Sequence, residues 1–111
     1  MASTIRVHDL EAQISFLTTE EGGRIGPAQS GYRPDHNFGL PGTLNAAAHE
    51  YIGQEVASPG ETVRAKVWLA IPELQASRLF EGFRFTVQEG NHIVGNGIIT
   101  KVLNASLSAD A

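Results

Sequence analysis

The stretch FRFTVQEGNHIVGNGIITKVL, residues 83–103, carries the strongest evidence for the fold. In its first part, Phe83, Phe85 and Val87 alternate with polar side chains. Successive side chains of a strand point to opposite faces, so this period of two predicts a strand with one buried face. Residues 89–92, EGNH, supply a turn, because glycine and asparagine tolerate positive φ. The stretch therefore predicts a β-hairpin.

The second strand of this hairpin, residues 92–103, carries Gly95, Asn96 and Gly97 in its middle. Glycines inside a strand usually mark a bulge or the close approach of another segment. We therefore expect the strand to bend. A bent strand paired with an alternating one is typical of a small closed or half-closed barrel.

Composition narrows the class of protein. The 111 residues suffice for one domain with one core, and the 12 glycines and 5 prolines suit an all-β domain with many turns. Eight Lys and Arg against 12 Asp and Glu provide no general attraction to nucleic acid or anionic lipid. The lack of cysteine excludes disulfides and thiol nucleophiles. No apolar run has the length of a signal peptide or membrane span, so we predict a soluble, cytoplasmic protein.

Two further strands follow from the same alternation. Residues 10–17 place Ala12, Ile14 and Phe16 on one face. Residues 62–70, TVRAKVWLA, show the cleanest alternation in the chain and place Trp68 on the outer face. That indole is then either exposed as an anchor or covered by residues 71–82, and we favour cover.

Other segments are less clearly patterned. Residues 32–38 predict a weaker strand, with Pro34 at its start or at an edge because proline offers no ladder donor. Residues 44–51 have helix propensity but no apolar stripe, so helix, strand and irregular crossover all remain open. Residues 71–82 predict one or two helical turns that end at Gly82.

The connection TTEEGGRIGPAQSG, residues 18–31, is polar and rich in glycine. Loops of this length are uncommon in small domains and are usually functional or disordered. Arg24 and Arg33 suit a partner's carboxylate or phosphate, because the guanidinium offers a fork of donors. The alternative is that one or both pair internally, with Glu20, Glu21 or Asp35.

No residue pattern predicts catalysis or cofactor binding. The histidines lack ligand spacing, so we interpret them as ordinary surface histidines and not as metal ligands: His8, His36, His49 and His92. Asp35 and His36 beside Arg33 resemble an acid–base pair, but no nucleophile in a strained turn accompanies them. Gly95-x-Gly97 lacks the third glycine and the helix of a dinucleotide loop. We predict no enzyme, no cofactor and no metal.

Four motifs stand in a fixed order: EGGR at residues 21–24, GYRP at 31–34, PGETV at 59–63, and the stretch at 83–103. Together they resemble the third, C-terminal β-barrel domain of bacterial elongation factor Tu, and the resemblance spans about residues 11–103. It implies an all-β fold, a six-stranded antiparallel β-barrel of Greek-key type. It also implies three parts: an N-terminal arm at 1–9, the barrel at 10–103, and a flexible tail at 104–111.

In that family, the third domain helps to hold the T stem of aminoacyl-tRNA, packs on the GTPase domain, contacts the exchange factor, and lines an antibiotic site at a domain interface. The antibiotic site lies near the EGGR and GYRP loops. The resemblance therefore implies a protein-facing surface of Glu21, Gly22, Gly23, Arg24, Tyr32, Arg33 and Asp35. The chain has no G-x-x-x-x-G-K-[ST] loop, so we expect no GTP hydrolysis.

The predicted function is a non-enzymatic binding module that docks a protein partner through the loop of residues 18–34. In one version it mimics the factor's third domain and competes for its GTPase domain, its exchange factor or a toxin that captures it. One alternative is binding of RNA at a tRNA stem, which the net negative charge disfavours. Another is a small-molecule site at the barrel mouth. Pairing of two copies through an edge near Leu10, or of Ile5 and Val7 at an edge, also remains open.

Overall fold

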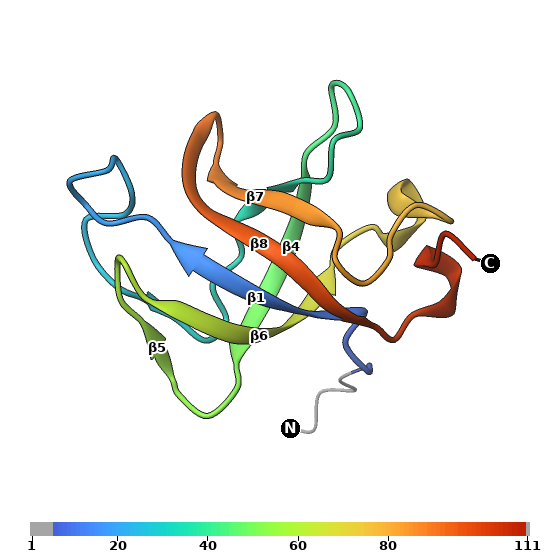
Figure 1. Cartoon of the computed structure of the whole chain (residues 1–111), viewed down its shortest axis with the longest axis horizontal. Coiled ribbons are helices and arrows are strands. Elements are labelled where there is room, and N and C mark those ends of the chain that lie inside the picture. The colour runs from blue at the N-terminus through green and yellow to red at the C-terminus, as the bar shows by residue number, and fades with distance from the viewer. Residues whose placement is uncertain (1–5, 111) are drawn as a thin grey trace.

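A computed structural model describes residues 6–110, and Ile5 lies outside this range. The chain forms short elements joined by turns (Figure 1). They are β1 (Leu10–Phe16), β2 (Ala28–Gln29), β3 (Asp35–Asn37), β4 (Asn45–Tyr51), β5 (Val56–Ala57), β6 (Thr62–Leu69), the 3-10 turn η1 (Pro72–Gln75), β7 (Arg84–Glu89), β8 (His92–Val102) and the 3-10 turn η2 (Ala105–Leu107).

Within the described residues, six strands close an antiparallel barrel in the order β1-β6-β4-β3-β7-β8, which confirms the predicted fold class. β1 pairs with β6 on one side and with β8 on the other. Leu10 therefore does not lie at a free edge, which removes the open alternative that two copies pair through it. The remaining strands, β2 and β5, form a small separate sheet.

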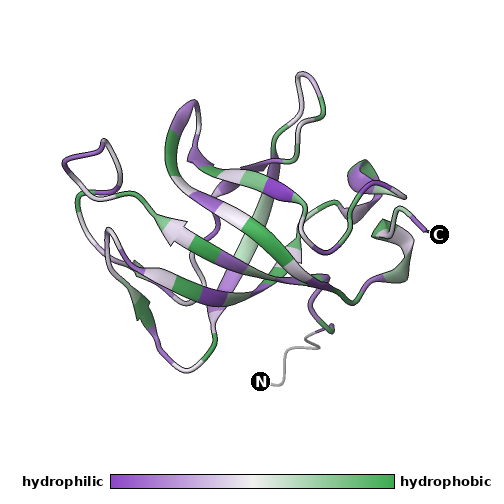
Figure 2. Ribbon diagram, viewed as in Figure 1, coloured by the Kyte–Doolittle hydropathy of each residue, from purple (hydrophilic) through white to green (hydrophobic). Residues whose placement is uncertain are grey.

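The core follows the predicted alternation (Figure 2). Ala12, Ile14 and Phe16 of β1 are buried, as are Phe85 and Val87 of β7. Every second residue of β6 joins them inside: Val63, Ala65, Val67 and Leu69. Apolar side chains from all sides of the barrel thus share one interior, and their removal from water is the main stabilising contribution.

β8 bends as expected, and its glycines have separate roles. The β7–β8 register shifts so that Val94 is left over beside Gly95, which is a bulge. A Cβ atom on Gly97 would lie 2.1 Å from the Phe85 ring. The ring of β7 therefore occupies the space above the strand, and only glycine leaves room for it.

The ambiguous and weaker segments are now defined. Residues 44–51 are strand, not helix, and β4 carries most of them. The predicted strand at 32–38 shortens to β3, and the loop at 18–31 contains β2, which the sequence did not predict. The predicted helical turns at 71–82 reduce to η1, which ends at Gln75 rather than at Gly82.

Trp68 lies on the outer face, as predicted, and is half-buried. Its cover differs from the prediction. The indole N–H donates to the carbonyl of Arg6 at 2.7 Å, and the His8 ring lies 5.5 Å from the indole centroid. Residues 6–8 therefore hold Trp68, not residues 71–82. Val7 is 71% exposed and belongs to no strand, so its predicted edge pairing is wrong.

The C-terminal segment 104–110 packs on the barrel, contrary to the predicted flexible tail. Leu107 is 0% exposed, and its carbonyl accepts hydrogen bonds from the backbone N–H groups of Arg78 and Leu79. Asn104 caps η2 by accepting a bond from the N–H of Ser106 at 3.1 Å. The prediction failed because the segment is mostly small and polar, and its one leucine, Leu107, packs against residues 78–79.

Asp9 connects the segment that enters the barrel, before β1, to the segment that leaves it, after β8. Its carboxylate is 1% exposed and accepts from the N–H of Leu69 at 2.7 Å and from the Asn104 amide at 2.9 Å. Its carbonyl accepts from the N–H of Leu103 at 2.9 Å. A buried carboxylate requires such donors, because unpaired burial is costly.

A histidine pair lies inside the barrel between β3 and β4. His36 and His49 are 0% and 1% exposed, so their interpretation as surface histidines is wrong. His36 Nδ1–H must donate to the Asn45 carbonyl (3.1 Å), since a carbonyl only accepts. His36 Nε2 is then the acceptor for His49 Nε2–H (2.8 Å), and His49 Nδ1 accepts from the Tyr51 hydroxyl (3.2 Å). Both imidazoles are neutral in this network.

We expect Gly97→Ala to lower the free energy of unfolding by about 1–3 kcal/mol, because the methyl group overpacks the Phe85 ring. Gly26→Ala is the matched control, since a Cβ there meets nothing within 4 Å and φ is not positive. Urea unfolding of both variants measures the difference. Equal stability of the two variants contradicts the packing at Gly97.

Acid should destabilise the barrel through the histidine pair. Burial lowers the pKa of His36 from 6.5 to about 4, and burial together with His36 lowers the pKa of His49. Below pH 6.5 these two histidines become protonated in the unfolded chain but stay neutral in the folded chain. Stability is therefore full above 6.5 and falls as pH drops toward the folded pKa, by about 1.4 kcal/mol per pH unit per histidine.

Urea unfolding between neutral pH and the folded pKa of His36 measures this loss. The double variant His36→Gln/His49→Gln is the control, and its stability, though lower at neutral pH, should change little over the same range. A wild-type profile as flat as that of the variant contradicts the assignment.

Candidate functional site

The glycine-rich loop begins with a tight turn. The carbonyl of Thr18 accepts from the N–H groups of Glu21 (3.1 Å) and Gly23 (2.9 Å), and the Glu21 carboxylate accepts from the N–H of Thr18 (2.8 Å). A Cβ on Gly23 would lie 2.5 Å from the Leu17 carbonyl oxygen. Gly23 is thus required by close backbone approach, and the predicted site residues Glu21 and Gly23 form the frame of the loop.

Arg24, Tyr32 and Glu89 form a cluster that we call the Arg24 clamp. The guanidinium lies 4.5 Å from the centroid of the Tyr32 ring and donates to the Glu89 carboxylate. The same carboxylate accepts from the Tyr32 hydroxyl at 2.5 Å. Arg24 also donates to the carbonyls of Gly26 and Pro27, both at 3.2 Å. Each of the three guanidinium nitrogens donates a hydrogen bond, and the bond to Glu89 holds the loop against the β7–β8 turn.

The electrostatics of the clamp follow from this sharing. The Tyr32 hydroxyl and then Arg24 lower the pKa of the Glu89 carboxyl, because both stabilise its charged form. Burial, reinforced by the Glu89 charge, raises the pKa of Tyr32. The phenol therefore stays protonated as a donor and the carboxylate stays ionised as an acceptor. On the same side, His92 donates a ring N–H to the carbonyl of Gly22.

The structure divides the predicted site residues into two groups. Glu21, Gly22, Gly23, Arg24 and Tyr32 gather in or against the loop. Arg33 and Asp35 lie instead on the outer face of the barrel wall, where Asp35 is opposite Gln88 of β7. The clamp thus bears out internal pairing of Arg24, although with an acid other than those anticipated.

Three contributors were missed from the sequence. Glu89 and His92 lie 65 and 70 residues from their loop partners, so nothing local indicated either contact. Ile25 is 92% exposed in the loop, next to the clamped Arg24 in the chain. A sequence signal did exist for Ile25, since it is a large apolar residue within an otherwise polar loop.

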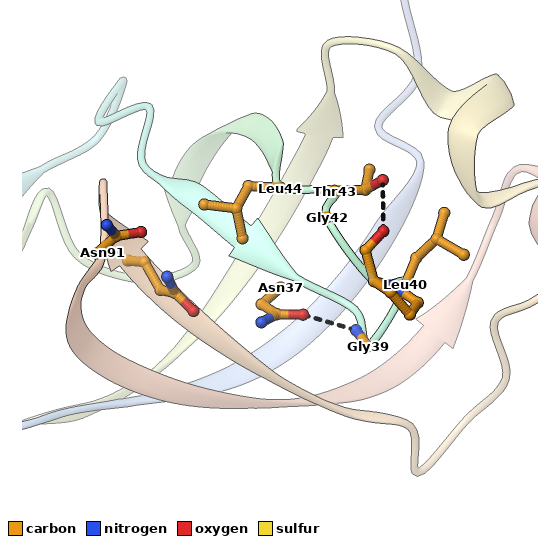
Figure 3. A pocket seen from close by; sticks show the side chains of 9 residues that line it. Asn37, Gly39, Leu40, Gly42, Thr43, Leu44 and Asn91 are labelled. Carbon is orange, nitrogen blue, oxygen red and sulfur yellow. Dashed lines mark hydrogen bonds between the residues drawn. The ribbon is translucent and has the colours of Figure 1, made fainter.

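A hollow of about 490 Å³ lies on the other side of the β7–β8 turn (Figure 3). The β3–β4 connection forms one wall, and side-chain amides form the opposite one. Asn37 already accepts from the N–H of Gly39 at 2.8 Å, and Thr43 donates to the Pro41 carbonyl at 3.4 Å. The lining has no ionisable side chain, so it offers no general acid or base to activate the Thr43 hydroxyl: Asn37, Gly39, Leu40, Pro41, Gly42, Thr43, Leu44, Gln88 and Asn91.

The described residues also bear on two other possibilities, a metal site and a membrane-spanning helix. Among residues 6–110, no three His, Asp or Glu side chains gather as metal ligands. Over the same range, no helix is long and apolar enough to span a bilayer. The buried histidines are fully engaged with each other and with neighbouring groups, and lie inside the core rather than at a surface.

A closed barrel of six antiparallel strands places the chain in the class of small all-β barrel domains. The chain belongs to the elongation factor Tu C-terminal domain family, whose model matches residues 3–103. In this family the domain is non-catalytic, and the GTPase activity lies in another domain. The resemblance carried by the four sequence motifs is therefore confirmed.

We expect Glu89→Gln to loosen the Arg24 clamp and to expose the Arg24–Ile25 bond to trypsin. The pair is partly exposed, so cleavage after Arg24 should rise by about three- to fivefold. Mass spectrometry of a limited digest measures that cleavage relative to cleavage after Arg84 in β7, which reports global opening. Glu81→Gln is the matched control. Parallel increases at both arginines would show that the whole barrel opens and would contradict a local clamp.

Proposed function

We propose that this domain is a non-enzymatic binding module that docks a protein partner through the loop of residues 18–34. The observation that carries the proposal is Ile25, which is 92% exposed on a loop held in place by the Arg24 clamp. A large apolar side chain on an ordered support suits an interface, because little conformational entropy is lost when the partner binds. Polar and charged residues around it supply the rim that such interfaces have.

Family membership supports a partner related to translation factors. In the version we favour, the loop engages a protein that also recognises the elongation factor: its GTPase domain, its exchange factor or a toxin that captures it. The 111 residues contain no phosphate-cradling loop, so the module acts by occupying a partner and not by hydrolysing GTP.

Two observations support a protein over RNA at this loop. The Arg24 guanidinium is already bound by Glu89, and the formal net charge of the chain is −4. Both reduce attraction to phosphate. The alternative of a small-molecule carrier relies on the hollow of Figure 3, whose neutral lining suits an uncharged polar compound. A thermal-shift screen tests that alternative.

We expect Ile25→Asp to reduce recovery of the partner by about tenfold or more, as the loss of an interface hot spot does. Affinity capture from lysate with the wild type and the variant as baits measures the change. Ile71→Asp is the matched control, because Ile71 is also exposed, at 53%, but lies outside the loop. Arg24 is unsuitable for this test, since its substitution would disorder the loop itself.

Calorimetry with purified proteins then measures direct binding of each captured protein, beginning with elongation factor Tu and its exchange factor. Equal recovery by all three baits contradicts docking through this loop. Recovery of tRNA that falls steeply with salt and is insensitive to Ile25→Asp favours the RNA alternative.

A further inference from the structure

The outer face of β4 and β6 carries an apolar hollow beside the end of the loop of residues 18–34, and neither Ile25 nor the Arg24 clamp lines it. Its volume is about 390 Å³, and Trp68, Ala48 and Gly31 contribute to its lining. Trp68 and Ala48 are cross-strand partners. Because Ala48 has only a methyl group, it leaves the face of the indole uncovered on that side.

Arg33 lies next to this hollow. Two backbone hydrogen bonds continue the β3–β4 register toward the loop: from the Ala47 N–H to the Pro34 carbonyl (3.1 Å) and from the His49 N–H to the Tyr32 carbonyl (2.9 Å). In this register Arg33 is opposite Ala48, and both side chains point outward. Arg33, Ala48 and Trp68 therefore form a row across the segment that leads into β3, β4 and β6.

The indole in this row is a fixed anchor. Its N–H is bound to the Arg6 carbonyl at 2.7 Å, and His8 lies against it with ring centroids 5.5 Å apart. Tryptophan and arginine are the residues most enriched among interface hot spots. An immobilised indole loses little rotamer freedom when a partner arrives, so its contact area contributes efficiently to binding.

The charges around the hollow indicate what can occupy it. Glu50 lines the hollow but faces Lys66, whose ammonium lies 3.6 Å from its carboxylate, so the two largely neutralise each other. Arg33 is exposed and forms no ion pair with the residues that the structure describes. Asp35 shares the outer face but lies one outward position further along the chain, opposite Ala46 rather than Ala48. The unpaired charge nearest the hollow is thus the cation of Arg33, which complements a carboxylate.

We propose that the outer face of β4 and β6 binds a protein segment that places an apolar side chain in the hollow against Trp68 and a carboxylate on Arg33. The Trp68 face, the gap above Ala48 and the guanidinium of Arg33 supply the contacts. This surface shares Gly31 and Arg33 with the loop of residues 18–34 but includes neither Ile25 nor the Arg24 clamp, and the proposal does not rest on docking through Ile25.

A library of random peptides displayed on phage, selected on the whole protein, identifies the preferred segment without assuming its sequence. We expect enriched peptides to combine a large apolar residue with a neighbouring aspartate or glutamate. Trp68 is the single tryptophan of the chain, so its fluorescence reports binding at this surface directly. Titration of an enriched peptide should give a saturable change in that emission.

A double-mutant cycle tests the ion pair. Arg33→Gln should weaken binding by about three- to fivefold, as should replacing the peptide carboxylate by an amide, and the two changes together should cost no more than either alone. Arg64→Gln, at an exposed arginine of β6, is the matched control and should leave affinity unchanged. Ala48→Gln should abolish binding by filling the hollow, and Ile25→Asp should have no effect.

The selection overturns the proposal if no peptide is enriched or if basic peptides are enriched. The cycle overturns it if the losses are additive or if Arg64→Gln causes an equal loss. A saturable response of Trp68 to single-stranded RNA without one to peptide also overturns it. Failure of Ile25→Asp to reduce partner capture concerns the loop alone, so the two surfaces are tested independently.

Discussion

Closure of the barrel depends on β8, which hydrogen-bonds to β1 on one side and β7 on the other. A strand of 11 residues can serve both neighbours only if it bends, and the bulge at Val94 and the bare backbone at Gly97 permit this. The Phe85 ring then fills the space that a side chain at Gly97 would take. One missing Cβ thus connects the curvature of the sheet to the packing of the core.

Much of this architecture was readable from the sequence because alternation is strong in β1, β6 and β7. The same rule failed for β4, whose inward positions are Asn45, Ala47, His49 and Tyr51. Alanine is small and the others are polar, so no apolar stripe appeared. The polar residues are inside because their hydrogen bonds are made there: His49 with His36 and Tyr51, and the Asn45 side chain with Gln75. Partners from other segments leave no local pattern in the sequence.

The site was only partly predictable for a related reason. The EGGR and GYRP motifs directed the prediction to this loop, and Arg24 and Tyr32 do lie together there. Their common partner, Glu89, comes from the hairpin turn, and its contact depends on the closed barrel. Arg33 was grouped with Arg24 because the resemblance implied one surface for the EGGR and GYRP motifs, whereas the alternation of the chain turns Arg33 onto the outer wall beside Ala48.

The Asp9 anchor sets where additional protein would emerge. Its backbone and side chain bind Leu103, Asn104 and Leu69, so the chain enters and leaves the barrel at one shared corner. In Figure 1 this corner lies away from the loop of residues 18–27. Residues 105–110 continue from this corner along residues 78–79, where the N–H of Ala109 donates to the Leu79 carbonyl at 2.9 Å. In Figure 1 this C-terminal end also lies away from the loop, so a domain fused there would leave the loop sterically open. The domain is consequently suited to attachment through its C-terminal end, with the loop of residues 18–27 facing outward.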